Sequence, residues 1–208
     1  MRTGEPLQEL VVSILIEGLG EMGEEAVSPL LELLNKSSLP DPVPSQIVNI
    51  LGQIGDRRAV RSLIQRLDDA SGRMRYEAAL ALRSIGDPVA VPPLVDHLED
   101  VQPDVVFAVA LALAGLGDSH SLNTLTFVLE TGSAEQRKQA AKALGVLGDR
   151  QATRNLVAAL KDNDQAVRHL AATSLGQIGD ARAKTALFSA LNDQSPSVRL
   201  QSALVLAG

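Results

Sequence analysis

Three histidines are the side chains of this sequence best suited to metal binding or proton transfer. They are His97, His120 and His169, and the absence of cysteine removes thiolate nucleophiles and zinc-thiolate sites. His97 and His120 fall at opposite ends of equivalent predicted helices, roughly 12 Å apart in helical rise, which is too far for a shared metal. We interpret the three histidines as solvated polar side chains. The serines and threonines show no nucleophile elbow, so we expect no catalytic residues, no metal site and no cofactor.

Glycine followed by aspartate is the most regular feature of the sequence. The pair recurs at a constant step of 31 residues, at Gly55, Gly86, Gly117, Gly148 and Gly179. A Gly-Asp pair alone is not a phosphate-binding motif. A glycine with left-handed backbone commonly ends a helix, and the aspartate after it can accept from the free N–H groups that open the next helix. The constant step therefore predicts a stack of helical hairpins.

Leucine recurs with the same step inside the predicted helices. One column holds Leu63, Leu94, Leu125, Leu156 and Leu187, and alanines at the matching positions of the partner helices leave room for these side chains. The first helix of each hairpin is expected near residues 6–20, 44–54, 73–85, 103–116, 134–147, 165–178 and 196–207. The second helix is expected near residues 25–35, 57–68, 88–99, 119–130, 150–161 and 181–192.

The sequence thus predicts an all-α protein of about six and a half repeats of 31 residues. We expect a single domain over residues 1–208. Residues 1–38 form a divergent acidic repeat, and residues 45–208 form the regular repeats. Residues 39–44 contain three prolines and cannot continue a helix, so they are expected to form a stiff joint.

Charge is distributed unevenly along the chain. The net charge of −6 lies in residues 1–41, because acidic and basic residues balance over residues 42–208. A neutral body without a basic stripe argues against nucleic-acid binding. We find no signal peptide and no apolar run long enough to cross a membrane. The lack of cysteine fits a reducing compartment, and we expect a cytoplasmic protein.

A family resemblance is carried by residues 162–180, which read DNDQAVRHLAATSLGQIGD. This segment resembles the HEAT-like repeat named after the phycobilisome lyases. Further copies of its arginine are Arg75, Arg137 and Arg199, and further copies of its first aspartate are Asp69, Asp100 and Asp193. The pattern is broken at Glu24, Pro44, Val106 and Thr131. We predict that Arg168 and Arg199 donate charge-assisted hydrogen bonds to aspartates of the same or the adjacent repeat.

The resemblance implies a right-handed α-solenoid that binds proteins on a concave face lined by the second helices. Members of the family attach or remove bilin chromophores, assist phycobilisome breakdown, or act as scaffolds. The predicted partner-binding residues on this face are Arg58, Arg61, Asp96, Asn123, Phe127 and Arg154. Phe127 is the one aromatic residue in the outward columns, and an exposed aromatic side chain flanked by arginines is typical of a binding hot spot. The alternatives are that Phe127 packs into a groove and that the arginines are only solvated.

These observations favour a non-catalytic scaffold that binds an acidic or mixed protein partner on the concave face. The alternative is a subunit of a bilin lyase or a phycobilisome-turnover factor, for which binding a phycobiliprotein or a bilin is the activity. Catalysis by this chain alone ranks third.

The N-terminal repeat suggests a second docking surface. Val12 and Ile14 occupy columns that are mostly polar further along the chain, within a ring of glutamates. Contiguous apolar surface of this kind usually marks an interface. We predict that this edge docks a second protein or a second copy of the chain. The alternative is that the joint lets the first repeat tilt and bury both side chains.

Overall fold

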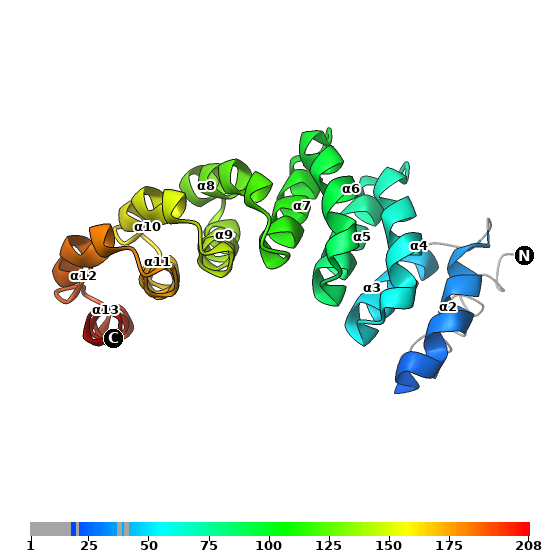
Figure 1. Cartoon of the computed structure of the whole chain (residues 1–208), viewed down its shortest axis with the longest axis horizontal. Coiled ribbons are helices and arrows are strands. Elements are labelled where there is room, and N and C mark those ends of the chain that lie inside the picture. The colour runs from blue at the N-terminus through cyan, green and yellow to red at the C-terminus, as the bar shows by residue number, and fades with distance from the viewer. Residues whose placement is uncertain (1–17, 20, 37–38, 40–41) are drawn as a thin grey trace, which may run out of the picture. The chain divides into compact units, whose positions relative to one another are not determined.

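The computed structural model describes residues 18–19, 21–36, 39 and 42–208, and all regular elements in these ranges are helical (Figure 1). The chain is an all-α solenoid, as the repeat predicts. Its contacts divide it into two compact units, residues 1–112 and 113–208. Most of the first predicted helix lies outside the described residues.

In residues 1–112, long first helices alternate with shorter second helices. The first helices are α3 (Val43–Ile54), α5 (Gly72–Ile85) and most of α7 (Pro103–Gly115). The second helices are α2 (Val27–Leu34), α4 (Val60–Gln65) and α6 (Val91–Asp96). These begin with the 3₁₀ turns η1 (Gly23–Ala26), η2 (Arg57–Ala59) and η4 (Pro88–Ala90), and η3 (Arg66–Asp68) and η5 (His97–Glu99) follow α4 and α6.

Residues 113–208 repeat the same plan. The first helices are α9 (Ala134–Leu147), α11 (Gln165–Ile178) and α13 (Pro196–Ala207). The second helices are α8 (Leu122–Thr131), α10 (Thr153–Ala159) and α12 (Lys184–Ala190), preceded by η6 (Ser119–Ser121), η7 (Arg150–Ala152) and η8 (Ala181–Ala183). Figure 1 shows α8, α10 and α12 in one layer and α9, α11 and α13 in the other.

The turn between the two helices of a hairpin follows the chemistry of the Gly-Asp pair. The five glycines have φ between 65° and 76°, a left-handed conformation that costs glycine little because it has no Cβ. Each aspartate accepts a hydrogen bond from the backbone N–H two residues later, at 2.8–3.0 Å. This cap opens the 3₁₀ turn that leads into the second helix.

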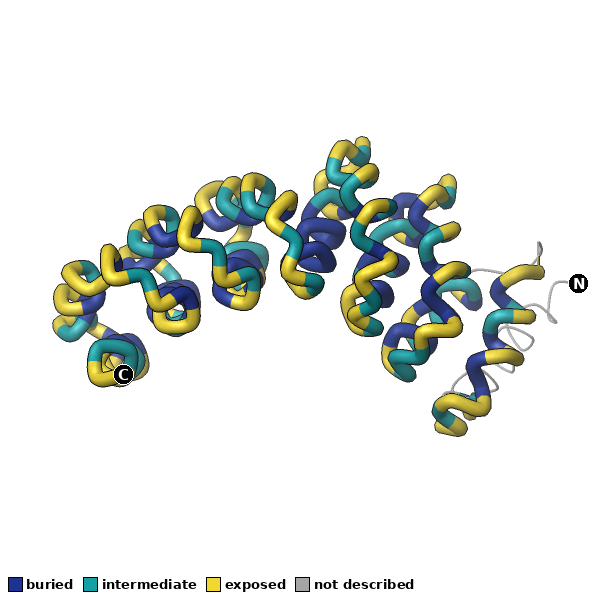
Figure 2. Tube along the Cα trace, in the orientation of Figure 1, coloured by how far each residue is buried: buried dark blue, intermediate teal, exposed yellow. Residues whose placement is uncertain are grey.

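The core lies between the two layers, where buried residues line the facing sides of the helices (Figure 2). The leucine column at positions 63, 94, 125, 156 and 187 is at most 3% exposed. Small residues allow the first helices to approach closely. At Gly145 of α9, an added Cβ would lie 2.5 Å from Ser174 Oγ of α11, and that hydroxyl donates to the carbonyl oxygen of Ala141 at 2.7 Å.

Arginine and aspartate join successive inter-hairpin turns in an arrangement that we call the Arg–Asp clamp. Arg75 donates two hydrogen bonds to Asp100 at 2.6 and 2.9 Å. Two further clamps have the same spacing of 25 residues, Arg137 with Asp162 and Arg168 with Asp193. Each arginine also donates to a backbone carbonyl of the turn before its own helix, so one guanidinium fastens two turns.

The clamps partly confirm the predicted role of the arginine column. Arg168 pairs with Asp193 as expected, at 2.8 and 3.1 Å. Arg199 donates to the carbonyl oxygens of Asp193 and Gln194, so its contact with an aspartate is made to the backbone and not to the carboxylate.

Candidate functional site

The outer side of the second helices presents the predicted outward columns to solvent. All fifteen positions are exposed, and they are Arg58, Arg61, Gln65, Val89, Pro92, Asp96, His120, Asn123, Phe127, Gln151, Arg154, Ala158, Arg182, Thr185 and Ser189. We call these positions the second-helix face. Since three columns stay exposed while the leucine column between the layers is buried, the 31-residue period correctly predicts which side of each second helix is exposed.

Phe127 projects from the middle of α8 and is 65% exposed. The interpretation in which Phe127 packs into a groove is therefore wrong for this structure. Phe188 on α12 is 58% exposed and was not among the predicted site residues. The equivalent positions of the other repeats hold Ile64, Val95, Thr126 and Val157, and these side chains are only partly exposed.

Two arginines of the second-helix face are held in place by their own caps. Arg58 donates to Asp56 at 2.7 and 3.0 Å and to the carbonyl oxygen of Glu24 at 2.8 Å. Arg182 donates to Asp180 at 2.8 Å and to the carbonyl oxygen of Arg150 at 2.9 Å. Hydrogen bonds from Arg182 lower the carboxyl pKa of Asp180 well below its usual range, so this carboxylate stays ionised at neutral pH.

Arg61 and Arg154 are exposed, and neither forms an ion pair with another described residue. Asp96 and Asn123 are also exposed. The six predicted partner-binding residues thus lie on the surface, with Arg58, Arg61 and Asp96 in the first unit and Asn123, Phe127 and Arg154 in the second. Val12 and Ile14 lie outside the described residues, and the N-terminal docking edge stays a prediction.

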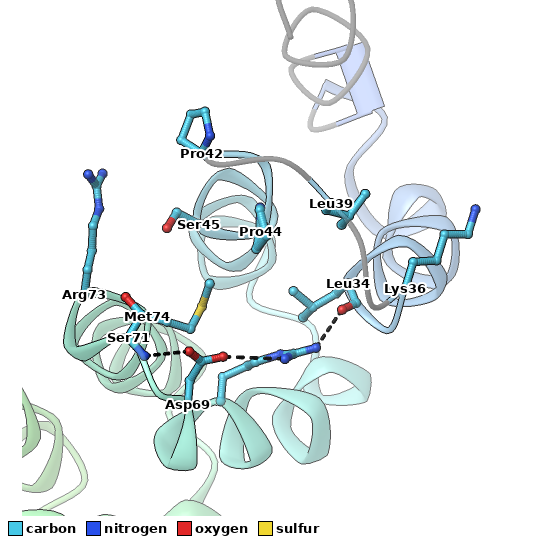
Figure 3. Close-up of a pocket in the computed structure, with 11 residues that line it drawn as sticks. Leu34, Lys36, Leu39, Pro42, Pro44, Ser45, Asp69, Ser71, Arg73 and Met74 are labelled. Atoms are coloured by element: carbon cyan, nitrogen blue, oxygen red, sulfur yellow. Dashed lines mark hydrogen bonds and ion pairs between the residues drawn. The ribbon is translucent and has the colours of Figure 1, made fainter. Parts of the chain in front are cut away.

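A cavity of about 370 Å³ lies where one Arg–Asp clamp is missing (Figure 3). Pro44 stands in the arginine column, 25 residues before Asp69, and both residues line the cavity. Arg66, the first residue of η3, reaches Asp69 instead, with Nη1 3.7 Å from Oδ2, and donates to the carbonyl oxygen of Leu34 at 2.6 Å. Arg66 is therefore a partial substitute for the clamp arginine that the sequence lacks.

Each histidine has a polar partner in the structure; His120 is exposed, as its interpretation as a solvated side chain predicts, whereas His97 and His169 are half-buried. His97 Nε2 lies 3.3 Å from Asp68 Oδ1, and Nδ1 lies 2.8 Å from the carbonyl oxygen of Pro93. His120 Nδ1 lies 2.7 Å from Asp118 Oδ1. His169 Nδ1 lies 3.3 Å from the carbonyl oxygen of Ser197. Within the described ranges, no three histidine, aspartate or glutamate side chains gather into a possible metal site.

A family model for HEAT repeats matches residues 8–83, 28–114, 60–141 and 122–207. The chain belongs to the HEAT-repeat family. The overlapping matches of this HEAT-repeat protein cover nearly its whole length, in agreement with the period read from the Gly-Asp pairs. No match was found among curated proteins.

Solved structures similar to this HEAT-repeat chain include natural and engineered repeat proteins. A chain of the complex of CpcE and CpcF of phycocyanin lyase from Nostoc sp. PCC7120 is 25% identical, with a TM-score of 0.61 over 99% of this chain and 83% of that chain. This match supports the resemblance to the repeats of the phycobilisome lyases. A designed armadillo repeat protein in complex with the peptide (KR)4 is 20% identical, with a TM-score of 0.64 over 86% of this chain and 97% of that chain, and shows the fold alone.

None of the described helices combines the length and the apolar character that a membrane span requires.

Proposed function

We propose that this HEAT-repeat chain is a scaffold that binds a protein partner on its second-helix face. The observation that carries the proposal is the exposure of three residue columns at a constant 31-residue step, with Phe127 projecting from one of them. Stacked repeats present such columns as an extended surface, and this is how solenoid proteins bind their partners. The partner-binding residues in this proposal are Arg58, Arg61, Asp96, Asn123, Phe127 and Arg154.

Phe127 is the proposed anchor of the interface. An exposed phenylalanine buries a large apolar area when a partner covers it. Truncating a central aromatic anchor commonly costs about 2 kcal/mol or more of binding free energy, which corresponds to roughly 30-fold in affinity. Arg154 on the neighbouring helix α10 supplies a planar donor that can bind a carboxylate with two hydrogen bonds.

A second candidate function is favoured by the similarity to the CpcE–CpcF complex of phycocyanin lyase. In this reading the chain is a subunit of a bilin lyase or a phycobilisome-turnover factor, and its partner is a phycobiliprotein or a bilin. Mixing the purified chain with a linear tetrapyrrole tests this candidate directly. A shifted visible absorption band supports it, and an unchanged pigment spectrum together with no binding to phycobiliproteins contradicts it.

The scaffold proposal is tested with a partner isolated from the native host, using Phe127→Ala and a matched control. Val146 on the opposite layer is also apolar and is 54% exposed, so Val146→Ala removes exposed apolar surface from the other side of the same unit. We expect Phe127→Ala to weaken partner affinity by at least about tenfold, while Val146→Ala retains it. The reverse pattern would place the partner on the first helices and overturn the proposal.

A further inference from the structure

The second unit exposes many more cations than anions, although its formal charge is nearly balanced. Of its acidic residues, only Glu130 and Glu135 are exposed. Seven basic residues are exposed, namely Lys142, Arg150, Arg154, Lys161, Arg182, Lys184 and Arg199. The structure describes every residue from 113 to 208, so the unit exposes seven cations and two acids in total. The balance of charge in the sequence therefore does not describe the surface.

The cause of this asymmetry is that the aspartates are used inside the fold. Asp118, Asp149 and Asp180 cap the second helices, and Asp162 and Asp193 accept from the clamp arginines. Asp164 caps α11 through the N–H groups of residues 166 and 167. All six are partly buried, and their lone pairs are directed to the backbone or to partner side chains.

Most of the exposed cations lie on or beside the second helices. Arg150, Arg154, Lys161 and Lys184 form no ion pair with any residue of the unit. Arg182 is the one member of this group that is paired, with Asp180. Glu130 is the one exposed acid in this layer, and it accepts a hydrogen bond from Asn155 Nδ2 of α10 at 2.7 Å.

The first unit differs, which makes the excess of cations a specific feature of the second. Its described residues include eight exposed acids, Glu21, Glu24, Glu25, Glu32, Asp68, Asp96, Glu99 and Asp104. They include six exposed cations, Lys36, Arg57, Arg58, Arg61, Arg73 and Arg83. The same repeat architecture is therefore acidic or mixed at its surface in one unit and cationic in the other.

We infer that the second-helix layer of residues 113–208 binds an acidic segment of the partner, with carboxylates at Arg154 and Lys161 and an apolar side chain on Phe127. This inference rests on the proposed function and adds the chemical class of the partner. Helices α8 and α10, which carry Phe127 and Arg154, are tied together by the Glu130–Asn155 hydrogen bond, and Lys161 lies in the turn that follows α10. Unpaired surface cations attract an acidic partner over long range and raise its association rate. The exposed phenylalanine supplies the apolar contact that charge alone lacks.

The inference is tested first with a defined probe. A short peptide of glutamates with one central leucine is titrated into the isotope-labelled full chain, and amide shifts are followed by NMR. We expect the shifts to cluster on α8, α10 and α12, and the affinity to fall steeply with added salt. The lysine counterpart of the peptide should not bind. Amide shifts that cluster on the first helices, or equal affinities for the acidic and the lysine peptide, would overturn the inference.

Charge reversal supplies the matched control. Arg154→Glu and Lys142→Glu change the net charge equally, but Lys142 is exposed on α9 in the opposite layer. We expect Arg154→Glu to weaken binding of the acidic peptide by about tenfold. Lys142→Glu should weaken it by less than about twofold. Equal losses would indicate a general charge effect and refute a specific site. Tighter binding of a short DNA duplex than of the acidic peptide would assign the face to nucleic acid instead.

The native partner separates this inference from the proposed function. Loss of capture with Phe127→Ala, combined with retention in high salt and in Arg154→Glu, would keep the scaffold function and refute the acidic partner. Retention of the partner by both variants would refute both proposals. Loss of capture with both variants, together with strong salt sensitivity, is the result we expect.

Discussion

Replacing Arg168 with alanine removes a guanidinium that fastens two inter-hairpin turns of the second unit. The side chains of Arg168 and Asp193 are only 6% and 11% exposed. Arg168 donates to both carboxylate oxygens of Asp193, at 2.8 and 3.1 Å. It also donates to the carbonyl oxygens of Asp162 and Asn163, at 2.8 and 3.2 Å. The substitution therefore breaks four hydrogen bonds and leaves the Asp193 carboxylate without its cation.

The expected loss of stability follows from the burial of this pair. Removing one partner of a buried ion pair costs about 3–5 kcal/mol, mainly because the remaining charge is left unpaired. Asp193 keeps the hydrogen bond from the Ser195 N–H at 2.8 Å and retains some contact with water. We therefore expect a loss near the lower end of that range, about 3 kcal/mol.

Arg199 provides the matched control within the same column. It donates to two turn carbonyls at 2.8 and 3.1 Å, as Arg168 does, but it binds no carboxylate and is exposed. We expect Arg199→Ala to cost less than about 1 kcal/mol, since exposed hydrogen bonds are exchanged for bonds to water. The difference between the two variants isolates the contribution of the carboxylate contact.

Urea unfolding followed by circular dichroism measures both variants, with Asp193→Ala and the double variant completing the cycle. The expected result is a lower midpoint for Arg168→Ala with the slope unchanged. Equal midpoints for Arg168→Ala and Arg199→Ala would refute the reasoning, because they would show that the clamp adds nothing beyond the carbonyl contacts.

Two further predictions concern pH and packing. Hydrogen bonds from its clamp arginine lower the carboxyl pKa of Asp100. Burial alone would raise the pKa values of Asp162 and Asp193, but hydrogen bonds from their clamp arginines bring both values below the usual range. The stabilisation that these carboxylates provide is fully present above their unfolded pKa of about 3.9, and it is lost as the pH falls through their folded pKa values. The free energy of unfolding should therefore drop below about pH 4. A melting temperature that stays constant from neutral pH to pH 2 would contradict this prediction. Gly145→Ala should cost about 1–3 kcal/mol, because its Cβ would lie 2.5 Å from Ser174 Oγ; an unchanged melting temperature would show that α9 and α11 separate freely.

The helices could be predicted closely from the sequence because two local signals agree with one period. The predicted ranges 134–147 and 165–178 coincide with α9 and α11, since glycine and aspartate mark one end of each helix and leucine spacing marks its buried side. The 3₁₀ turns at the start of the second helices were not predicted. They arise because the capping aspartate accepts from the N–H two residues later, which tightens the first turn.

The exposure of the candidate site residues was predictable from the sequence, but the excess of cations around them was not. Which positions face outward follows from the period, and Phe127 and Arg154 were found in this way. The choice of Asp193 as the partner of Arg168, among several aspartates of the repeat, required coordinates. So did the role of Arg66, which comes from another column to meet Asp69. A sequence counts every aspartate as one surface charge, whereas the fold uses all six aspartates of the second unit in caps and clamps.

The spacing of the Arg–Asp clamp has a consequence for how such an array can change its length. Residues 163–193 form one block of 31 residues that contains both Arg168 and Asp193, together with the cap formed by Asp180. Duplication or loss of a block cut in the inter-hairpin turns carries both members of the pair together. A cut between the two helices of a hairpin separates Arg168 from Asp193, and the pairing then depends on the junction restoring a carboxylate 25 positions after each arginine. Recombination at the turns therefore adds or removes whole repeats without creating an unpaired buried charge.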